Sequence, residues 1–127
     1  MKSMRTPLKK VRYLGSAKEG ADHFWKQRVT AVANMFLGAF LVWLIASLLG
    51  ADYETARQKL ANPLIALPLL ALILSATIHM RIGMQVIIED YVHEEGLKLA
   101  ALVLNTFFAI TIALASVFAV LKLSFGA

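Results

Sequence analysis

The sequence predicts an all-α membrane protein with three transmembrane helices. Of its 127 residues, 59% are hydrophobic and 17% are charged, an apolar share above and a charged share below those of soluble domains. The apolar residues also gather in three long runs that are almost free of formal charge. At about 1.5 Å per residue, each run is long enough to cross a hydrocarbon core of roughly 30 Å.

The predicted spans cover about residues 29–49, 63–88 and 99–121. The first contains no charged residue. The second opens at Pro63, which suits the first turn of a helix, and Arg81 is its only formal charge. The third is free of charge but contains polar side chains that can bond to a neighbouring helix or to their own carbonyls, namely Asn105, Thr106, Thr111 and Ser116.

Basic residues gather before the first span, in an N-terminal segment of residues 1–28. The positive-inside rule therefore places the N-terminus in the cytoplasm, and three crossings place the C-terminus on the outer, periplasmic side of a bacterial cytoplasmic (inner) membrane. Residues 29–127 form the anchor domain, and the acidic connector between spans two and three, residues 89–96, faces the cytoplasm. This topology explains the net charge of +5 better than a nucleic-acid partner does.

The residues that point to function lie on the second span. His79 stands more than about two turns inside it, where an ionisable residue is costly. At 100° per residue, Gly83, Val86 and Asp90 fall within roughly 40° of His79 on one stripe. A neutral imidazole is a common axial ligand of haem iron, and an interhelical hydrogen bond explains the histidine equally well. A six-coordinate haem would need its second ligand from another polypeptide, because His79 is the only histidine deep in a span.

Other side chains of this helix fit the same site. Gly83 leaves room where a flat macrocycle would otherwise clash. Tyr91 offers a phenolic donor at the depth of a quinone head group, although an aromatic-belt position explains it better on placement alone. Asp90 would tune that phenol or relay protons, or it is a solvated carboxylate. Arg81 points roughly opposite His79, which favours snorkelling or a bond to a partner over a role beside haem.

The run from His79 to Val92 resembles the signature of the small hydrophobic membrane anchor of succinate dehydrogenase. In that family a glycine follows the histidine by four residues, and Asp-Tyr follows it by eleven and twelve. The stretch His23–Ala31, with Phe24 and Arg28 four residues apart, is similar to the start of the family's first helix. The three-span topology matches over nearly the whole chain.

This resemblance implies that His79 is one axial ligand of a b-type haem shared with the larger cytochrome b anchor subunit. It implies that Tyr91 hydrogen-bonds ubiquinone with Asp90 beside it, that Arg28 lies near the haem propionates, and that Gly83 provides clearance. The flavoprotein and iron-sulfur subunits would supply the chemistry of succinate oxidation. This chain has no catalytic activity alone, since it lacks cysteine to hold a cluster and any dinucleotide-binding motif.

Three alternatives stay open at the level of sequence. An anchor of a fumarate reductase would work in the opposite direction, because potentials and quinone type decide direction. A small proton-coupled transporter would use His79 and Asp90 as a proton relay and would need no partner. A purely structural assembly factor would tolerate replacement of Tyr91 without loss of quinone reduction.

Overall fold

The computed structural model describes residues 4, 6–8 and 19–126, and these contain helices and no strand. Three of the helices are long and apolar enough to cross a membrane, which confirms the predicted all-α fold with three transmembrane helices, whereas the orientation of the termini stays a prediction. The N-terminal segment up to residue 18 lies mostly outside the described residues. In chain order the helices are α2 (Glu19–Ser47), the short α3 (Tyr53–Ala61), α4 (Pro63–Tyr91) and α5 (Glu95–Ser124).

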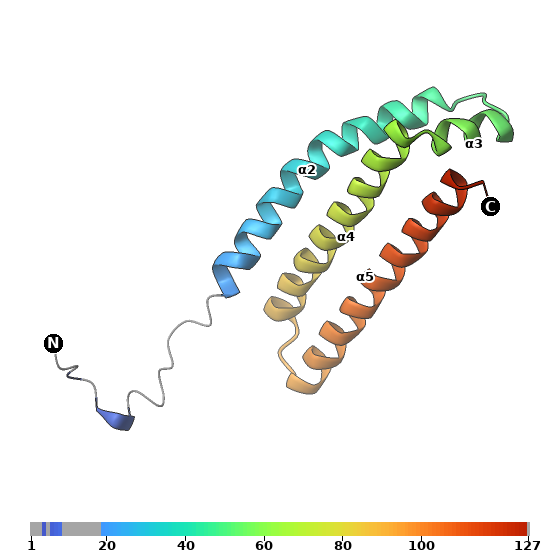
Figure 1. The fold of residues 1–127 in the computed structure, drawn as a ribbon. Helices are drawn as coiled ribbons and strands as arrows, with labels where there is room; N and C mark the ends of the chain where they lie inside the picture. The colour runs from blue at the N-terminus through green and yellow to red at the C-terminus, as the bar shows by residue number, and fades with distance from the viewer. Residues whose placement is uncertain (1–3, 5, 9–18, 127) are drawn as a thin grey trace.

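The long helices form an open layer with α4 in the middle (Figure 1). Helix α4 packs against both α2 and α5, whereas no contact joins α2 to α5 in the described chain. The start of α2 and the α4–α5 connector lie at one end of the layer, and α3 and the C-terminus lie at the other (Figure 1). This arrangement buries few of the described side chains. All of them are apolar: Leu44, Ala66, Ile82, Ile88, Ala109 and Val120. Lipid or partner subunits must therefore cover most of the apolar surface.

Each long helix extends beyond at least one end of the span expected for it, although α2 ends at Ser47, before the expected residue 49. Helix α2 begins at Glu19 rather than at residue 29, and α5 runs from Glu95 to Ser124 rather than from 99 to 121. The charged residues of the extra turns can pair with one another along the helix, as Lys26 does with Asp22 one turn earlier. Charge marks where the chain leaves the lipid, whereas the helical hydrogen bonds continue until a cap or a turn ends them.

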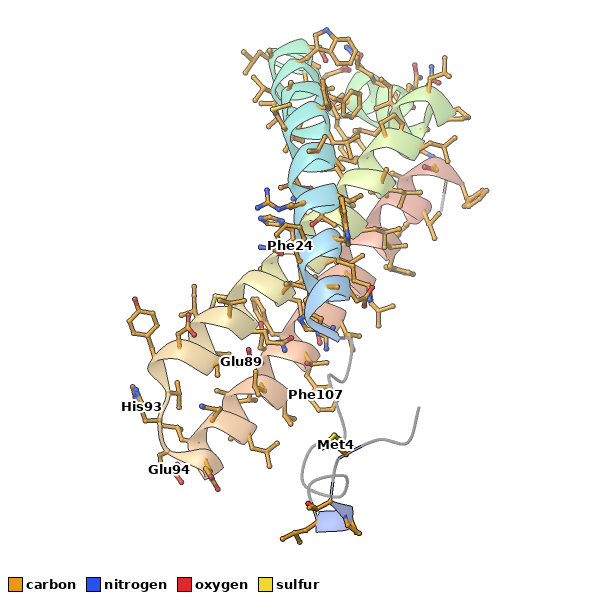
Figure 2. The ribbon with its side chains drawn as sticks, turned by 90° about the vertical axis from the view of Figure 1, so that its left-hand side faces the viewer. Met4, Phe24, Glu89, His93, Glu94 and Phe107 are labelled. Atoms are coloured by element: carbon orange, nitrogen blue, oxygen red, sulfur yellow. The ribbon has the colours of Figure 1, made fainter. Side chains whose placement is uncertain are left out.

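The acidic connector is shorter than the predicted range 89–96. Residues up to Tyr91 belong to α4 and residues from Glu95 belong to α5, so only residues 92–94 are free of helix. Figure 2 shows Glu89, His93 and Glu94 at this end of the molecule. The Glu94 carboxylate caps α5 by accepting a hydrogen bond from the Gly96 backbone N–H at 2.9 Å, and this bond allows α5 to begin early.

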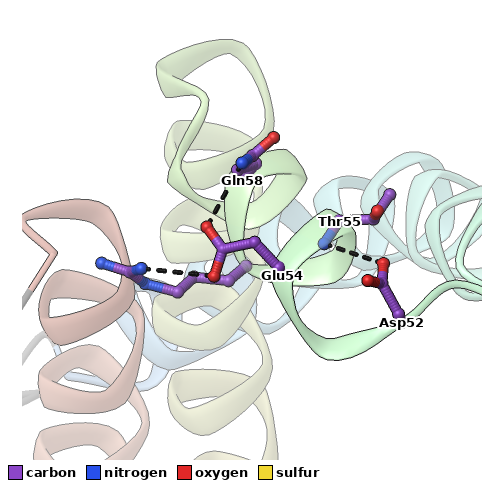
Figure 3. Close-up of polar contacts among 5 residues, drawn as sticks. Asp52, Glu54, Thr55 and Gln58 are labelled. Atoms are coloured by element: carbon purple, nitrogen blue, oxygen red, sulfur yellow. Dashed lines mark hydrogen bonds and ion pairs between the residues drawn. The ribbon is translucent and has the colours of Figure 1, made fainter.

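Helix α3 lies between the first two predicted spans, and Figure 3 shows its polar contacts. Asp52 is its N-cap, because its carboxylate accepts a hydrogen bond from the Thr55 backbone N–H at 3.1 Å. Within the helix, the Glu54 carboxylate accepts a bond from Gln58 Nε2 at 3.2 Å and pairs with Arg57 at 3.5 Å. Periodicity in a nine-residue segment is too weak to predict such a helix, and the caps and pairs stabilise it.

A sharp corner joins α3 to α4. Asn62 ends α3, and its side chain accepts a hydrogen bond from the Leu64 backbone N–H at 2.9 Å, which caps α4. Pro63 then stands in the first turn, as the sequence predicts. Helix α4 continues through Pro68 without interruption.

The Asp52 cap makes the start of α3 sensitive to acid. Hydrogen bonds from the Thr55 hydroxyl and backbone N–H hold the pKa of Asp52 below its ordinary value of 3.8. The cap is therefore fully present above pH 3.8 and is lost as the pH falls through the lowered folded-state value. We expect Asp52→Ala to speed amide hydrogen exchange in the first turn of α3 at neutral pH. Asp52→Asn, which keeps the acceptor, should preserve slow exchange and abolish its acid dependence. Equal protection factors in all three proteins would contradict this cap.

Candidate functional site

His79 lies on the face of α4 that packs against α2. Its Nδ1 is 3.1 Å from Oγ1 of Thr30 on α2. Ser75, one turn earlier on α4, donates a hydrogen bond to the Thr30 backbone carbonyl at 3.3 Å. His79 Nε2 makes no hydrogen bond to the described part of the chain. One ring nitrogen is thus held at the helix contact and the other is left for an external group.

Gly83 also faces α2. A Cβ added there would lie 3.5 Å from Gln27 Nε2, which is an ordinary contact distance, so a methyl group would fit and a larger side chain would displace Gln27. The Gln27 Oε1 atom is buried without a hydrogen-bond partner among the described residues. The α2–α4 contact one turn from His79, toward the connector, therefore contains a glycine without a side chain and a Gln27 oxygen without a hydrogen-bond donor in the described chain.

Arg28 is on a different side of α2 from the residue that holds His79. Arg28 precedes Thr30 by two positions, which corresponds to roughly 160° around the helix. The Arg28 guanidinium stacks 4.3 Å above the centre of the Phe24 ring and lines a cavity of about 360 Å³ between α2 and α4. Val86, on the stripe of His79, lines the same cavity. The structure thus brings Arg28 to a cavity shared with the His79 stripe of α4, and His79 itself does not line that cavity.

Arg81 faces away from His79, as the helical periodicity predicts. Its Nε donates a hydrogen bond to Thr106 Oγ1 on α5 at 3.3 Å, and its backbone carbonyl accepts one from Asn105 Nδ2 at 2.9 Å. Thr111 instead bonds to the Phe107 carbonyl of its own helix at 2.8 Å. Three of the four polar residues of the third span therefore act in the two ways expected of them, whereas the Ser116 side chain makes no hydrogen bond within the described residues.

Asp90 and Tyr91 form the last turn of α4. Both side chains are exposed, Tyr91 by 77%, and neither makes a hydrogen bond or an ion pair within the described residues. Twelve residues of helix place Tyr91 roughly 18 Å along the axis from His79. The phenol and the carboxylate are thus free to contact a ligand or a partner at the end of the layer.

The described residues contain no group of three or more His, Cys, Asp or Glu side chains that could hold a metal ion. This finding leaves no multi-ligand protein site in that part of the chain. A haem makes a smaller demand, because its macrocycle supplies four nitrogen ligands and the protein supplies only axial ones. A single imidazole with an open Nε2 fits that demand.

Two residues of the site, Thr30 and Gln27, were not predicted. Gln27 lies just before the predicted first span and Thr30 lies at its start, and their spacing of three residues puts them on one face of a helix. That spacing was the one signal in the sequence that could have pointed to these two residues. The sequence did not show which helix this face packs against.

Comparison with known proteins identifies the family. The family model described as succinate dehydrogenase/fumarate reductase transmembrane subunit matches residues 2–114. The chain belongs to this family. The predicted resemblance is thereby confirmed, and the chain is a multi-pass membrane anchor that associates with the other subunits of such a complex. The curated homologues are named as membrane anchor subunits of succinate dehydrogenase.

Curated relatives agree with this assignment. The succinate dehydrogenase hydrophobic membrane anchor subunit of Paracoccus denitrificans is 30% identical over 122 residues, which cover 96% of this chain and 94% of the relative. That of Rickettsia bellii (strain RML369-C) is 29% identical over 116 residues, covering 91% and 93%. The succinate dehydrogenase membrane anchor subunit of Reclinomonas americana is 30% identical over 98 residues, covering 75% and 82%. No solved structure gives a significant match.

Proposed function

We propose that this chain is the small membrane anchor of a succinate:ubiquinone oxidoreductase, in which it co-ligates a haem b and forms one wall of the ubiquinone-reduction site. One observation carries the proposal: a deep imidazole has one nitrogen bound by Thr30 and the other open. The same helix presents a free carboxylate and a free phenol at its end. The family description includes fumarate reductase, and the names of the curated relatives favour succinate oxidation.

His79 Nε2 would be one axial ligand of the haem. The second would come from the larger cytochrome b anchor subunit, because no other histidine lies deep in the described spans. Arg28, at the cavity it shares with Val86, would meet the propionates, and Gly83 would keep a side chain away from the macrocycle. A haem bound there supplies reversible one-electron transfer, and the residues of this chain hold and orient it.

Tyr91 would donate a hydrogen bond to one carbonyl oxygen of ubiquinone. Reduction to the quinol requires two electrons and two protons, and a donor at that oxygen stabilises the charge that develops on it. Asp90, the preceding residue, would orient the phenol and hold a proton near it. Both residues stand at the end of a span, where the ring system of a quinone reaches water and its protons.

The partners would be the larger cytochrome b anchor, the iron-sulfur subunit and the flavoprotein. The two soluble subunits would bind where the α4–α5 connector lies, and that end would face the cytoplasm if the basic N-terminal segment follows the positive-inside rule. Because the start of α2 lies at the same end (Figure 1), Arg28, Asp90 and Tyr91 would all face the side from which electrons arrive. The membrane would be a bacterial cytoplasmic membrane.

The test is to purify the complex from membranes through a tag on this chain. We expect a flavoprotein, an iron-sulfur protein and a second membrane subunit to co-purify, with a b-type band in the reduced-minus-oxidised spectrum and succinate-dependent ubiquinone reduction. Faster quinol:fumarate turnover than succinate:ubiquinone turnover would favour the fumarate reductase alternative. A preparation without haem and flavoprotein, with ion flux through vesicles containing this chain alone, would refute the anchor function in favour of a transporter.

A further inference from the structure

The contacts of Thr30 locate its hydroxyl proton. Thr30 Oγ1 lies 2.7 Å from the Lys26 carbonyl oxygen and 3.2 Å from that of Gln27. A carbonyl oxygen can only accept a hydrogen bond, and a hydroxyl has a single proton to donate. Two oxygens 2.7 Å apart need that proton between them. The Thr30 hydroxyl therefore donates to the backbone of its own helix.

This assignment determines the tautomer of His79. With its proton directed at Lys26, Thr30 Oγ1 offers only a lone pair to Nδ1 of His79, 3.1 Å away, so Nδ1 must be the donor. A neutral imidazole carries one proton, and a charged one is costly in the middle of a span. His79 Nε2 is consequently unprotonated and presents its lone pair outward.

We propose that Thr30 is a positioning residue of the haem site. It holds His79 in the Nδ1–H tautomer and thereby directs Nε2 to the iron. This inference rests on the proposed function and adds a residue to it. A ligand histidine that donates its other N–H becomes a stronger electron donor and is fixed in orientation. The bond from Ser75 on α4 to the Thr30 backbone carbonyl, at 3.3 Å, holds the acceptor in register with the ring.

The test compares Thr30→Val and Thr30→Ala with Thr30→Ser in the purified complex. The first two remove the acceptor, and we expect the midpoint potential of the haem to shift to more positive values, because a weaker donor stabilises ferric iron less. Haem affinity should fall on the order of 10- to 100-fold, as for other supporting partners of a metal ligand. Thr30→Ser keeps the hydroxyl and should retain the wild-type potential. Thr111→Val is the matched control, since that hydroxyl bonds only to its own helix at 2.8 Å.

A second readout needs neither haem nor partner subunits. Nitrogen-15 NMR of this chain in lipid should show, for the His79 ring, a protonated Nδ1 and an unprotonated Nε2 in wild type and in Thr30→Ser. Thr30→Val should lose this preference. An unchanged potential and an unchanged tautomer in Thr30→Val would overturn the inference while the haem, and the proposed function, remain. A wild-type complex without b-type haem would overturn the proposed function and the haem part of the inference together.

Discussion

Replacing His79 by alanine is expected to remove the b-type absorption band of the complex. The substitution deletes the only deep imidazole of the described spans. Its Nδ1 is bound to Thr30, and its Nε2 is left to bind iron. Loss of a residue that merely supports a metal ligand costs about 10- to 100-fold in affinity, so the loss of the ligand itself should reduce haem content by at least that factor. The measurement is the dithionite-reduced minus oxidised spectrum, normalised to the flavin content of the complex.

His93→Ala provides the matched control for this prediction. It removes an imidazole from the same chain, but at the exposed α4–α5 connector (Figure 2), and it should leave the band at full height. A wild-type band that persists unchanged in His79→Ala would exclude His79 as an iron ligand. The interhelical hydrogen bond to Thr30 would then be its whole function, and helix packing rather than haem content would respond to the substitution.

Replacing Tyr91 by phenylalanine is expected to lower ubiquinone reduction by roughly 10²-fold, the usual effect of losing a group that donates to developing charge. The change removes one oxygen atom from a side chain that is 77% exposed and that has no hydrogen-bond partner in the described chain. Folding and haem content should therefore be unaffected. Succinate oxidation with an artificial electron acceptor should also stay at the wild-type rate, because that reaction does not use the quinone site.

Tyr53→Phe is the matched control for Tyr91. Tyr53 is also a largely exposed tyrosine, at 75%, but it begins α3 at the opposite end of the layer (Figure 1). Its phenylalanine variant should reduce ubiquinone at the wild-type rate. If Tyr91→Phe retains wild-type ubiquinone reduction, Tyr91 is an aromatic-belt residue, and the phenol has no part in the reaction.

Much of the site is accessible from the sequence because a single helix carries it. His79, Gly83, Asp90 and Tyr91 all belong to α4, and helical periodicity places the first three on one stripe without knowledge of any other element. The predicted connector was the weak point, because acidic residues suggested a loop where α4 continues to Tyr91. The correction supports the periodicity argument, since the stripe is helical over its full length.

The sequence by itself determined that the chain lies in a lipid bilayer, how many times it spans the bilayer, and which helix carries the candidate ligands. Long charge-free runs require a bilayer whatever their neighbours are, so these properties are local. Only the tertiary structure decided that α4 is central, that His79 faces Thr30 on α2 and that Arg81 faces Thr106 on α5. The physical reason is that lipid is as apolar as the side chains it covers, so hydrophobicity does not select the face that meets a partner helix. Close packing and a few polar contacts select that face, and these depend on the residues of both helices.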